Sequence, residues 1–383
     1  MQRRVSIDPF QVSVGEAVLE DLRDRLGRTR WPQQIGNAGW DYGTNLGYLR
    51  ELCESWVTDY DWRLTEKRLN SMPQFTTVIE GLRIHFLHIV SPVSGARPLL
   101  LLHGWPSSVL EFLGVIDPLT NPAAHGGSAA DAFSLVIPSL PGYGWSEAPK
   151  ARGWHDGRIA AAFLELMGRL GYDACYTQGG DWGSIISAEM TRLAPDRILG
   201  FHTSFLVTAG YLAEDEPLSA EEQAVEEARV AYNASERAYI ALQSTKPDSL
   251  GFGLADSPAA HAAWIVEKLR RWSDSRGDLE QTLSRSSILD LVTTYWVTNT
   301  GAASARLYYE TAAAGRMGLQ PRVHVPTSVA VFPAELNRVA RRVAERHYNI
   351  VRWTVMDRGG HFPAWEQPDT FVHDLRESFA AGS

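Results

Sequence analysis

The segment Gly179-Gly180-Asp181-Trp182-Gly183 places an acidic residue in a turn of small residues, between a short apolar run and a segment with helical spacing. Turns of this form present a nucleophile at the end of a strand, and their glycines let the backbone pack closely. The reference pKa of aspartate is about 3.9, so the carboxylate is ionised at neutral pH and needs no base to activate it. Asp181 can therefore displace a leaving group at a saturated carbon and form an ester.

Two residues later in the chain supply what such an ester needs for hydrolysis. Glu335 follows an apolar run at 327–332, and His361 follows another at 351–356. The order nucleophile, acid, histidine is the one that this kind of turn requires when each residue follows its own strand. We predict that His361 is the general base that activates water. Glu335 is predicted to orient the imidazole ring and to stabilise its protonated form.

The loop at 103–106 has the sequence His-Gly-Trp-Pro and also follows an apolar run. In this architecture such a loop supplies one backbone N–H of an oxyanion hole, and the residue after the nucleophile supplies the second. We predict the N–H groups of Trp105 and Trp182 as these donors, which would hold the oxyanion formed when water attacks the Asp181 ester. The remaining members are expected to shape the loop without transferring protons: His103, Gly104 and Pro106.

Alternating strand and helix patterns surround these residues. Continuous apolar runs that end in loops of glycine and proline are typical of buried parallel strands. The alternation predicts a doubly wound, mostly parallel α/β sheet. The expected strands are 75–79 and 82–89, joined as a hairpin, then 98–102, 133–138, 174–178, 199–206, 327–332 and 351–356, with helices at 159–170 and 185–193.

The same pattern divides the chain into four parts. Residues 1–74 carry two helical patterns and several tryptophans, and are expected to form an arm packed on the core. The core occupies 75–206 and 324–383. Between them, 207–323 is mostly helical and is expected to be a lid. Ligands of open parallel sheets bind at the carboxyl ends of the strands, so this lid is expected to cover the site.

Composition excludes several classes of function. A net charge of −9 argues against a nucleic-acid or anionic-membrane partner.

The sequence also indicates where the protein is located. No stretch is long and apolar enough to span a bilayer, and the first residues lack the apolar centre of a signal peptide, so the expected location is the cytoplasm. Two cysteines give no disulfide framework. We expect no metal, because His85 and His88 fall on opposite faces of a strand, and no phosphate-binding loop is present.

Several motifs together resemble the epoxide hydrolases of the microsomal type, which carry an N-terminal arm on the α/β-hydrolase fold. Because the chain starts at the arm, it is most similar to the soluble microbial members, without the membrane anchor of the mammalian relatives. The motifs cover both arm and core: residues 28–32, 60–63, 103–106, 138–142, 179–184, 332–336 and 358–362.

The resemblance implies the opening of an epoxide by water to a vicinal diol, through an ester on Asp181 and without cofactor or metal. It also implies two lid tyrosines that hydrogen-bond the epoxide oxygen, at Tyr239 and Tyr308. Tyr309 is adjacent to the second position, and the spacing to Glu310 favours Tyr308. A phenol can donate its proton to the alkoxide that forms as the ring opens. A homodimer is a further implication of the resemblance.

Two alternatives remain beside this reading. A haloalkane dehalogenase also uses an aspartate nucleophile and places a tryptophan beside it to hold the halide, as Trp182 could. The arm and the lid tyrosines argue against it, because a halide leaving group needs no proton. A binding module that has lost turnover is the second alternative, and the complete set of Asp181, Glu335 and His361 argues against that. The sequence does not specify which epoxide is bound or which carbon is attacked.

Overall fold

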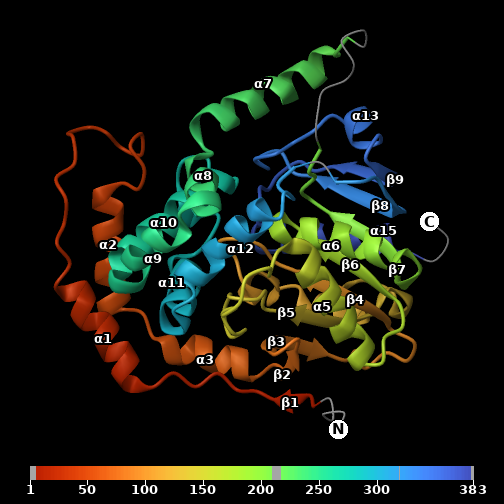
Figure 1. Cartoon of the computed structure of the whole chain (residues 1–383), viewed down its shortest axis with the longest axis horizontal. Helices are drawn as coiled ribbons and strands as arrows, with labels where there is room; N and C mark the ends of the chain where they lie inside the picture. The colour runs from red at the N-terminus through yellow and green to blue at the C-terminus, as the bar shows by residue number, and fades with distance from the viewer. Residues whose placement is uncertain (1–5, 209–216, 319, 381–383) are drawn as a thin grey trace.

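The apolar runs form a nine-stranded sheet in the computed structural model, which describes residues 6–208, 217–318 and 320–380. Across the sheet the described strands run in the order β1-β2-β3-β5-β4-β6-β7-β8-β9 (Figure 1). Their bounds are β1 (Asp8–Pro9), β2 (Gln74–Ile79), β3 (Leu82–Ile89), β4 (Arg97–Leu102), β5 (Phe133–Pro138), β6 (Cys175–Gly179), β7 (Ile198–Thr203), β8 (Val323–Val331) and β9 (Tyr348–Val355).

The sheet is antiparallel at one edge and parallel in the rest. The pairs β1–β2, β2–β3 and β3–β5 are antiparallel. The pairs from β5–β4 to β8–β9 are parallel. Leu99 to Leu102 of β4 are wholly buried, as expected of a strand covered on both faces. The predicted doubly wound, mostly parallel sheet is confirmed.

The predicted hairpin is formed by β2 and β3. Its two central residues, Glu80 and Gly81, have φ angles of 49° and 80°. A two-residue turn of type I′ needs positive φ at both positions, because only then does its twist match that of the strands. The register pairs Ile79 directly with Leu82.

Strand ends differ from expectation by up to four residues, most at β7, β8 and β9. β9 begins at Tyr348, before the expected 351. β7 ends at Thr203 and does not continue to 206, because the Thr203 hydroxyl accepts a hydrogen bond from the Phe205 N–H and replaces the ladder there. β8 begins at Val323, before the expected 327. The register of β8 shifts between Val323 and Pro326, and such an irregularity lets a strand tolerate proline.

Helices that follow the strands cover the sheet. α5 (Asp156–Arg169) packs against α6 (Asp181–Leu193), and α6 contacts β4, β6, β7 and β8. Both helices were predicted, but α6 begins four residues before the expected 185, directly at the acidic residue of the turn. The other helices of the core are α4 (Ile116–Thr120), α13 (Arg341–Ala344), α14 (Pro363–Glu366) and α15 (Pro368–Ser378).

Six α-helices lie between β7 and β8 in the described part of the chain, and we call them the lid. α8, α9 and α12 pack together, whereas α7 projects away from the body of the molecule (Figure 1). Ser219 and Glu222 form a capping box at the start of α7. The bounds are α7 (Ala220–Ser235), α8 (Ala238–Thr245), α9 (Pro247–Asp256), α10 (Pro258–Trp272), α11 (Arg285–Thr298) and α12 (Gly301–Ala313).

The arm contains α1 (Glu16–Gly27), α2 (Leu46–Thr58) and α3 (Trp62–Asn70). Its side chains reach α11 of the lid. The Trp56 indole N–H donates to the Thr293 hydroxyl at 2.8 Å. The Tyr60 hydroxyl donates to the Asp290 carboxylate, also at 2.8 Å. The arm therefore fixes one side of the lid, as Figure 1 shows for α1 and α2 beside α9 to α11.

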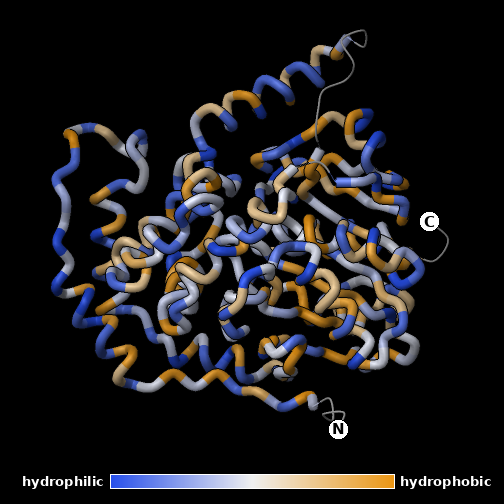
Figure 2. Tube along the Cα trace, in the orientation of Figure 1, coloured by the Kyte–Doolittle hydropathy of each residue, from blue (hydrophilic) through white to orange (hydrophobic). Residues whose placement is uncertain are grey.

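Hydrophobic residues gather along the strands of the sheet, while α7 alternates hydrophilic and hydrophobic residues along its length (Figure 2). Within α7, Tyr232 is the buried residue. Across the described ranges, no helix combines the length and the apolar character that crossing a bilayer demands.

Candidate active site

Asp181 is the first residue of α6 and directly follows the loop after β6. Its φ is 47°, in the left-handed region that few residues other than glycine adopt. The neighbouring glycines are required by contact distance. A Cβ on Gly183 would lie 2.0 Å from the Leu102 carbonyl oxygen, and one on Gly179 would lie 2.2 Å from the Gly183 carbonyl carbon. This strained turn presents the carboxylate at the carboxyl end of the sheet.

The loop after β4 holds one oxygen of that carboxylate. The Trp105 N–H donates to Oδ1 of Asp181 at 2.8 Å. A Cβ on Gly104 would lie 2.3 Å from Asp181, so the approach requires glycine. The second predicted donor, Trp182 N–H, makes no hydrogen bond to Asp181 within the described residues. It lies in the first turn of α6, where backbone N–H groups lack helical partners.

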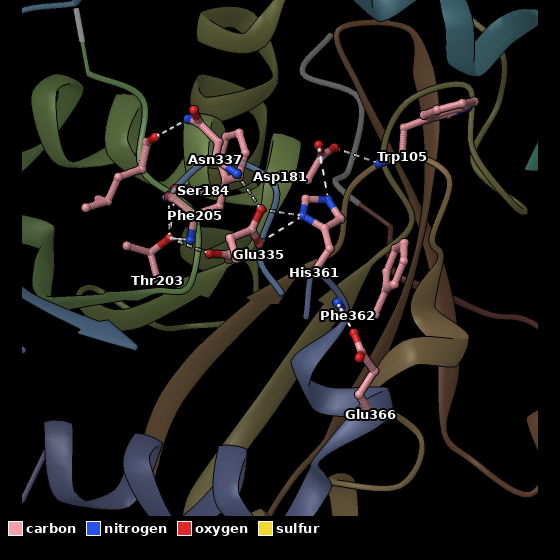
Figure 3. A network of polar contacts seen from close by, with 12 residues as sticks. Trp105, Asp181, Ser184, Thr203, Phe205, Glu335, Asn337, His361, Phe362 and Glu366 are labelled. Atoms are coloured by element: carbon pink, nitrogen blue, oxygen red, sulfur yellow. Dashed lines mark hydrogen bonds and ion pairs between the residues drawn. The ribbon is translucent and has the colours of Figure 1, made fainter. Parts of the chain in front are cut away.

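His361 lies between two carboxylates (Figure 3). Its Nδ1 is 2.9 Å from Oε2 of Glu335, and its Nε2 is 3.5 Å from Oδ2 of Asp181. The Glu335 carboxylate also accepts from the Asn337 N–H at 3.2 Å, which fixes its orientation. The structure thus brings together the three residues that the sequence order singled out, from loops after β6, β8 and β9.

Both members of the His361–Glu335 pair are buried, with exposed fractions of 3% and 5%. Burial alone lowers the pKa of His361, but the charge of Glu335 and the nearby Asp181 carboxylate outweigh it. The balance raises the pKa of His361 to about 10. The imidazole is therefore protonated at neutral pH.

Tyr239 on α8 and Tyr308 on α12 line the same cavity as Asp181. The cavity has a volume of about 310 Å³. Burial raises the pKa of both phenols well above 10. Aromatic rings fix the two side chains: Trp105 stacks on Tyr239 at 5.3 Å, and Trp182 meets Tyr308 edge-on at 4.8 Å.

Of the two adjacent tyrosines on α12, Tyr308 is the one at the site. It is buried beside Trp182, whereas Tyr309 is half-buried and does not line the cavity. Since successive residues of a helix point about 100° apart, only one of the pair can face Asp181.

Family models match two parts of the chain. "Epoxide hydrolase N terminus" matches residues 7–112, and "alpha/beta hydrolase fold" matches residues 97–232. Over 97% of its length the chain is 35% identical to Epoxide hydrolase 1 of Oryctolagus cuniculus, covering 88% of that protein. It belongs to the epoxide hydrolase family. A Stigmatella aurantiaca protein with a provisional epoxide hydrolase name is 46% identical, with 97% of this chain and 84% of that protein covered.

Solved structures of epoxide hydrolases match the fold of this chain. The juvenile hormone epoxide hydrolase of the silkworm Bombyx mori matches with a TM-score of 0.90 and 33% identity, covering 98% of this chain and 94% of that one. The epoxide hydrolase of Aspergillus niger matches with a TM-score of 0.86 and 32% identity, covering 97% and 96%. The α/β-hydrolase fold and the resemblance stated from the sequence are thereby confirmed. The comparisons do not favour the dehalogenase alternative.

In this epoxide hydrolase His103 is held by backbone groups on both ring nitrogens. The Leu140 N–H donates to Nε2 at 3.2 Å, and Nδ1 donates to the Gly104 carbonyl at 3.1 Å. Burial lowers the pKa of His103 to about 4, so the ring is neutral. These contacts suit the loop-shaping role expected of it. Pro106, also expected to shape the loop, is buried and follows a cis peptide bond.

Two buried carboxyl groups near His361 escaped sequence analysis. Glu111 accepts a hydrogen bond from the Ser107 hydroxyl at 2.6 Å, and burial raises its pKa to about 7. Glu366 accepts from the Phe362 N–H at 2.9 Å (Figure 3), and burial likewise raises its pKa to about 7. For Glu111 the sequence did contain a signal of burial, because this glutamate stands within the apolar sequence Val-Leu-Glu-Phe at 109–112.

The histidines with ligand-like spacing have protein partners. His85 contacts the Ser139 hydroxyl and the Gln74 amide oxygen at 2.9 and 3.0 Å. His88 contacts the Tyr172 hydroxyl at 2.9 Å. Among the residues that the structure describes, no cluster of three or more histidine, cysteine or acidic side chains is suited to a metal ion.

Proposed function

We propose that this protein converts an epoxide and water to a vicinal diol through a covalent ester on Asp181. The observation that carries the proposal is the shared cavity of Asp181, Tyr239 and Tyr308. An epoxide needs a nucleophile on one side of its carbon–oxygen bond and a proton donor on the other. A carboxylate and two phenols around one cavity supply both.

Ring opening follows from this arrangement. Oδ2 of Asp181 attacks an epoxide carbon, and the bond from that carbon to the epoxide oxygen breaks. The electron pair goes to the oxygen, which takes hydrogen bonds or a proton from Tyr239 and Tyr308. Trp105 N–H holds Oδ1 and so fixes the direction of the attacking oxygen. The product of this step is a hydroxyalkyl ester.

Hydrolysis of the ester uses His361 in its neutral form. Ester formation removes the negative charge of Asp181, which is one of the two charges that raise the pKa of His361. The imidazolium therefore becomes more acidic and gives its proton, through water, to the phenolate left by ring opening, so that the tyrosine is restored and His361 becomes a neutral base. His361 then takes a proton from water as the hydroxide attacks the ester carbon, and the oxyanion on Oδ1 is held by the Trp105 N–H. Collapse breaks the bond between the ester carbon and Oδ2, and the leaving alkoxide takes the proton from the imidazolium to give the diol. The new carboxylic acid of Asp181 then gives its proton to His361, which restores the starting charges.

A second, small cavity touches the same groups from another side. Its volume is about 10 Å³, and it is lined by Asp181, His361, Trp105, Ser107 and Glu111 among others. This lies near the lower limit of about 10–15 Å³ for one buried water molecule. We place the hydrolytic water here, with Glu111 as a polar partner that positions it.

The mechanism is tested by trapping the ester. His361→Gln, incubated with an epoxide such as styrene oxide, should gain the mass of one epoxide, and peptide mapping should place it on Asp181. The wild-type protein should release diol and carry no lasting adduct. A folded variant that binds the epoxide yet gains no mass would contradict the covalent route, and halide release from alkyl halides without epoxide turnover would favour the dehalogenase.

The proposal also covers the cellular location of the protein and its oligomeric state. Cys53 and Cys175 are buried free thiols, which suits a reducing compartment, and we propose the cytoplasm. A homodimer is the proposed assembly, supported by the family resemblance alone. Light scattering of the purified protein should give about twice the mass of one chain, and a monomer mass would overturn it.

A further inference from the structure

Lys268 is a buried lysine in a chain that has four. Lys67, Lys150 and Lys246 are exposed, whereas Lys268, near the end of α10, has an exposed fraction of 6%. Burying an ammonium group costs free energy unless the group is paired or held by other favourable contacts. We therefore ask which side chains lie next to its ammonium group and compensate for the burial.

The ammonium lies over the ring of a tyrosine from the cavity. Nζ of Lys268 is 5.1 Å from the centroid of the Tyr239 ring and 5.9 Å from that of Trp272. Both distances are within the range of about 6 Å over which a cation is attracted to an aromatic face. Glu267 forms an ion pair with Nζ. Tyr239 itself is stacked against Trp105, which fixes its ring in this position.

We propose that Lys268 makes Tyr239 a better proton donor during epoxide opening, by stabilising negative charge that builds up in the phenol ring. The inference rests on the proposed function. As the Tyr239 hydroxyl gives its proton toward the epoxide oxygen, electron density rises in the ring, and its attraction to the ammonium grows. Burial works in the opposite direction, because it raises the pKa of Tyr239 well above 10. A fixed cation at the ring offsets part of that cost.

The geometry limits Lys268 to an indirect role. Lys268 does not line the cavity of about 310 Å³, so it acts through Tyr239 and is a positioning residue. Its charge should affect ester formation, in which the phenol donates, and not ester hydrolysis, in which His361 acts.

Under this proposal Tyr239 and Tyr308 differ in their ability to donate a proton. Among the described residues no cation lies over Tyr308, whose ring neighbours are Trp105, Trp182 and Tyr239. Tyr239 is therefore assigned the larger share of the proton transfer, and Tyr308 the role of a hydrogen-bond donor.

A double-mutant cycle tests the inference. Single-turnover ester formation is followed by rapid quench and intact mass, in the wild type, Lys268→Met, Tyr239→Phe and the double variant. Lys268→Met should slow ester formation about tenfold, as expected for loss of a desolvated cation–π contact. In the Tyr239→Phe background the same change should cost less than about twofold, because the group that it acts on is gone. The rate of ester breakdown should stay at the wild-type value.

Equal slowing in both backgrounds, or slower ester breakdown, would show a packing role and overturn the inference. Lys67→Met is the matched control, since it removes an exposed lysine of the arm and should change neither step. If Lys268→Met does not fold, as judged by its thermal melt, Glu267→Gln provides the test. It removes the opposing charge, so ester formation should be at least as fast as in the wild type, and slowing would count against the inference. Absence of an ester in His361→Gln, in which hydrolysis is blocked, would overturn the proposed function itself.

Discussion

Nε2 of His361 lies 3.5 Å from Oδ2 of Asp181, on the side of the ring opposite the Glu335 carboxylate. The buried imidazolium thus lies between two negative charges, one of which the reaction removes. In the proposed mechanism, esterification of Asp181 removes its negative charge, so that His361 becomes a base at the hydrolysis step. This contact would then couple the first chemical step to the second through electrostatics.

Asp181→Asn should fold and lose turnover. Asparagine tolerates the left-handed φ of this turn better than most residues, so the strained backbone can be kept. The amide is not a competent nucleophile, and loss of about 10⁴-fold in kcat is expected by analogy with removal of other nucleophiles. Diol formation measured by chromatography, together with a melting curve, checks this. Activity near the wild-type level would exclude Asp181 as nucleophile.

Tyr308→Phe and Tyr309→Phe form a matched pair on adjacent positions of α12. Tyr308 lines the cavity and Tyr309 does not. Loss of the Tyr308 hydroxyl should slow ester formation by about tenfold, because the hydrogen bond that it gives to the developing alkoxide contributes about 1.5 kcal/mol. Tyr309→Phe should leave the rate within about twofold of the wild type. The reverse ranking in a single-turnover assay would move the second donor to Tyr309.

The folded protein should lose stability at alkaline pH through His361. Its pKa in the fold, about 10, is above the ordinary value of about 6.5, so the folded state binds the proton more tightly. The resulting stabilisation is fully present below about pH 6.5 and is lost as the pH rises through about 10. Urea unfolding across this range should show the wild type losing its advantage over His361→Gln. A constant difference between the two would contradict the assigned charge.

Glu111→Gln should change the pH dependence of stability in a different window. Burial raises the pKa of Glu111 to about 7 from its ordinary value of 4.5, so the fold favours its protonated form. Stability therefore falls as the pH rises from about 4.5 through 7. Glutamine can still accept the Ser107 hydrogen bond, so the variant should melt higher than the wild type at pH 8.5 and not at pH 4.5. Equal melting differences at both values would disprove the raised pKa.

Gly183→Ala and Gly253→Ala should have opposite effects. A Cβ at Gly183 would lie 2.0 Å from the Leu102 carbonyl oxygen, and that overlap should cost about 3 kcal/mol or more of unfolding free energy. Gly253 lies inside α9 with no atom within 4 Å of its added Cβ. Alanine there should stabilise the protein by about 0.5–1 kcal/mol. Urea unfolding of both variants provides the measurement, and similar stabilities would contradict the close approach at the turn.

Local signals in the sequence predicted eight of the nine described strands and the order of the three central residues, but not the two-residue edge strand β1. The runs before Asp181, Glu335 and His361 are apolar because buried parallel strands must be so. Each is followed by a loop with its own polar residue, so strand position and site position are encoded together. Even the hairpin turn at Glu80-Gly81 is a local property of two residues.

Tertiary structure decided what depends on residues far apart in the chain. The end of β7 is set by the Thr203 hydroxyl, and the attachment of the arm by Trp56 and Thr293, which are 237 positions apart. In the sequence Lys268 is one polar residue among others on a helical segment. Only the folded structure shows that it lies over the Tyr239 ring. Periodicity reports which face of an element is buried, but not which element it meets. The residues of the proposed chemistry could therefore be predicted from the sequence. The charged groups that surround them, such as Lys268 over Tyr239, depend on how the lid packs on the core.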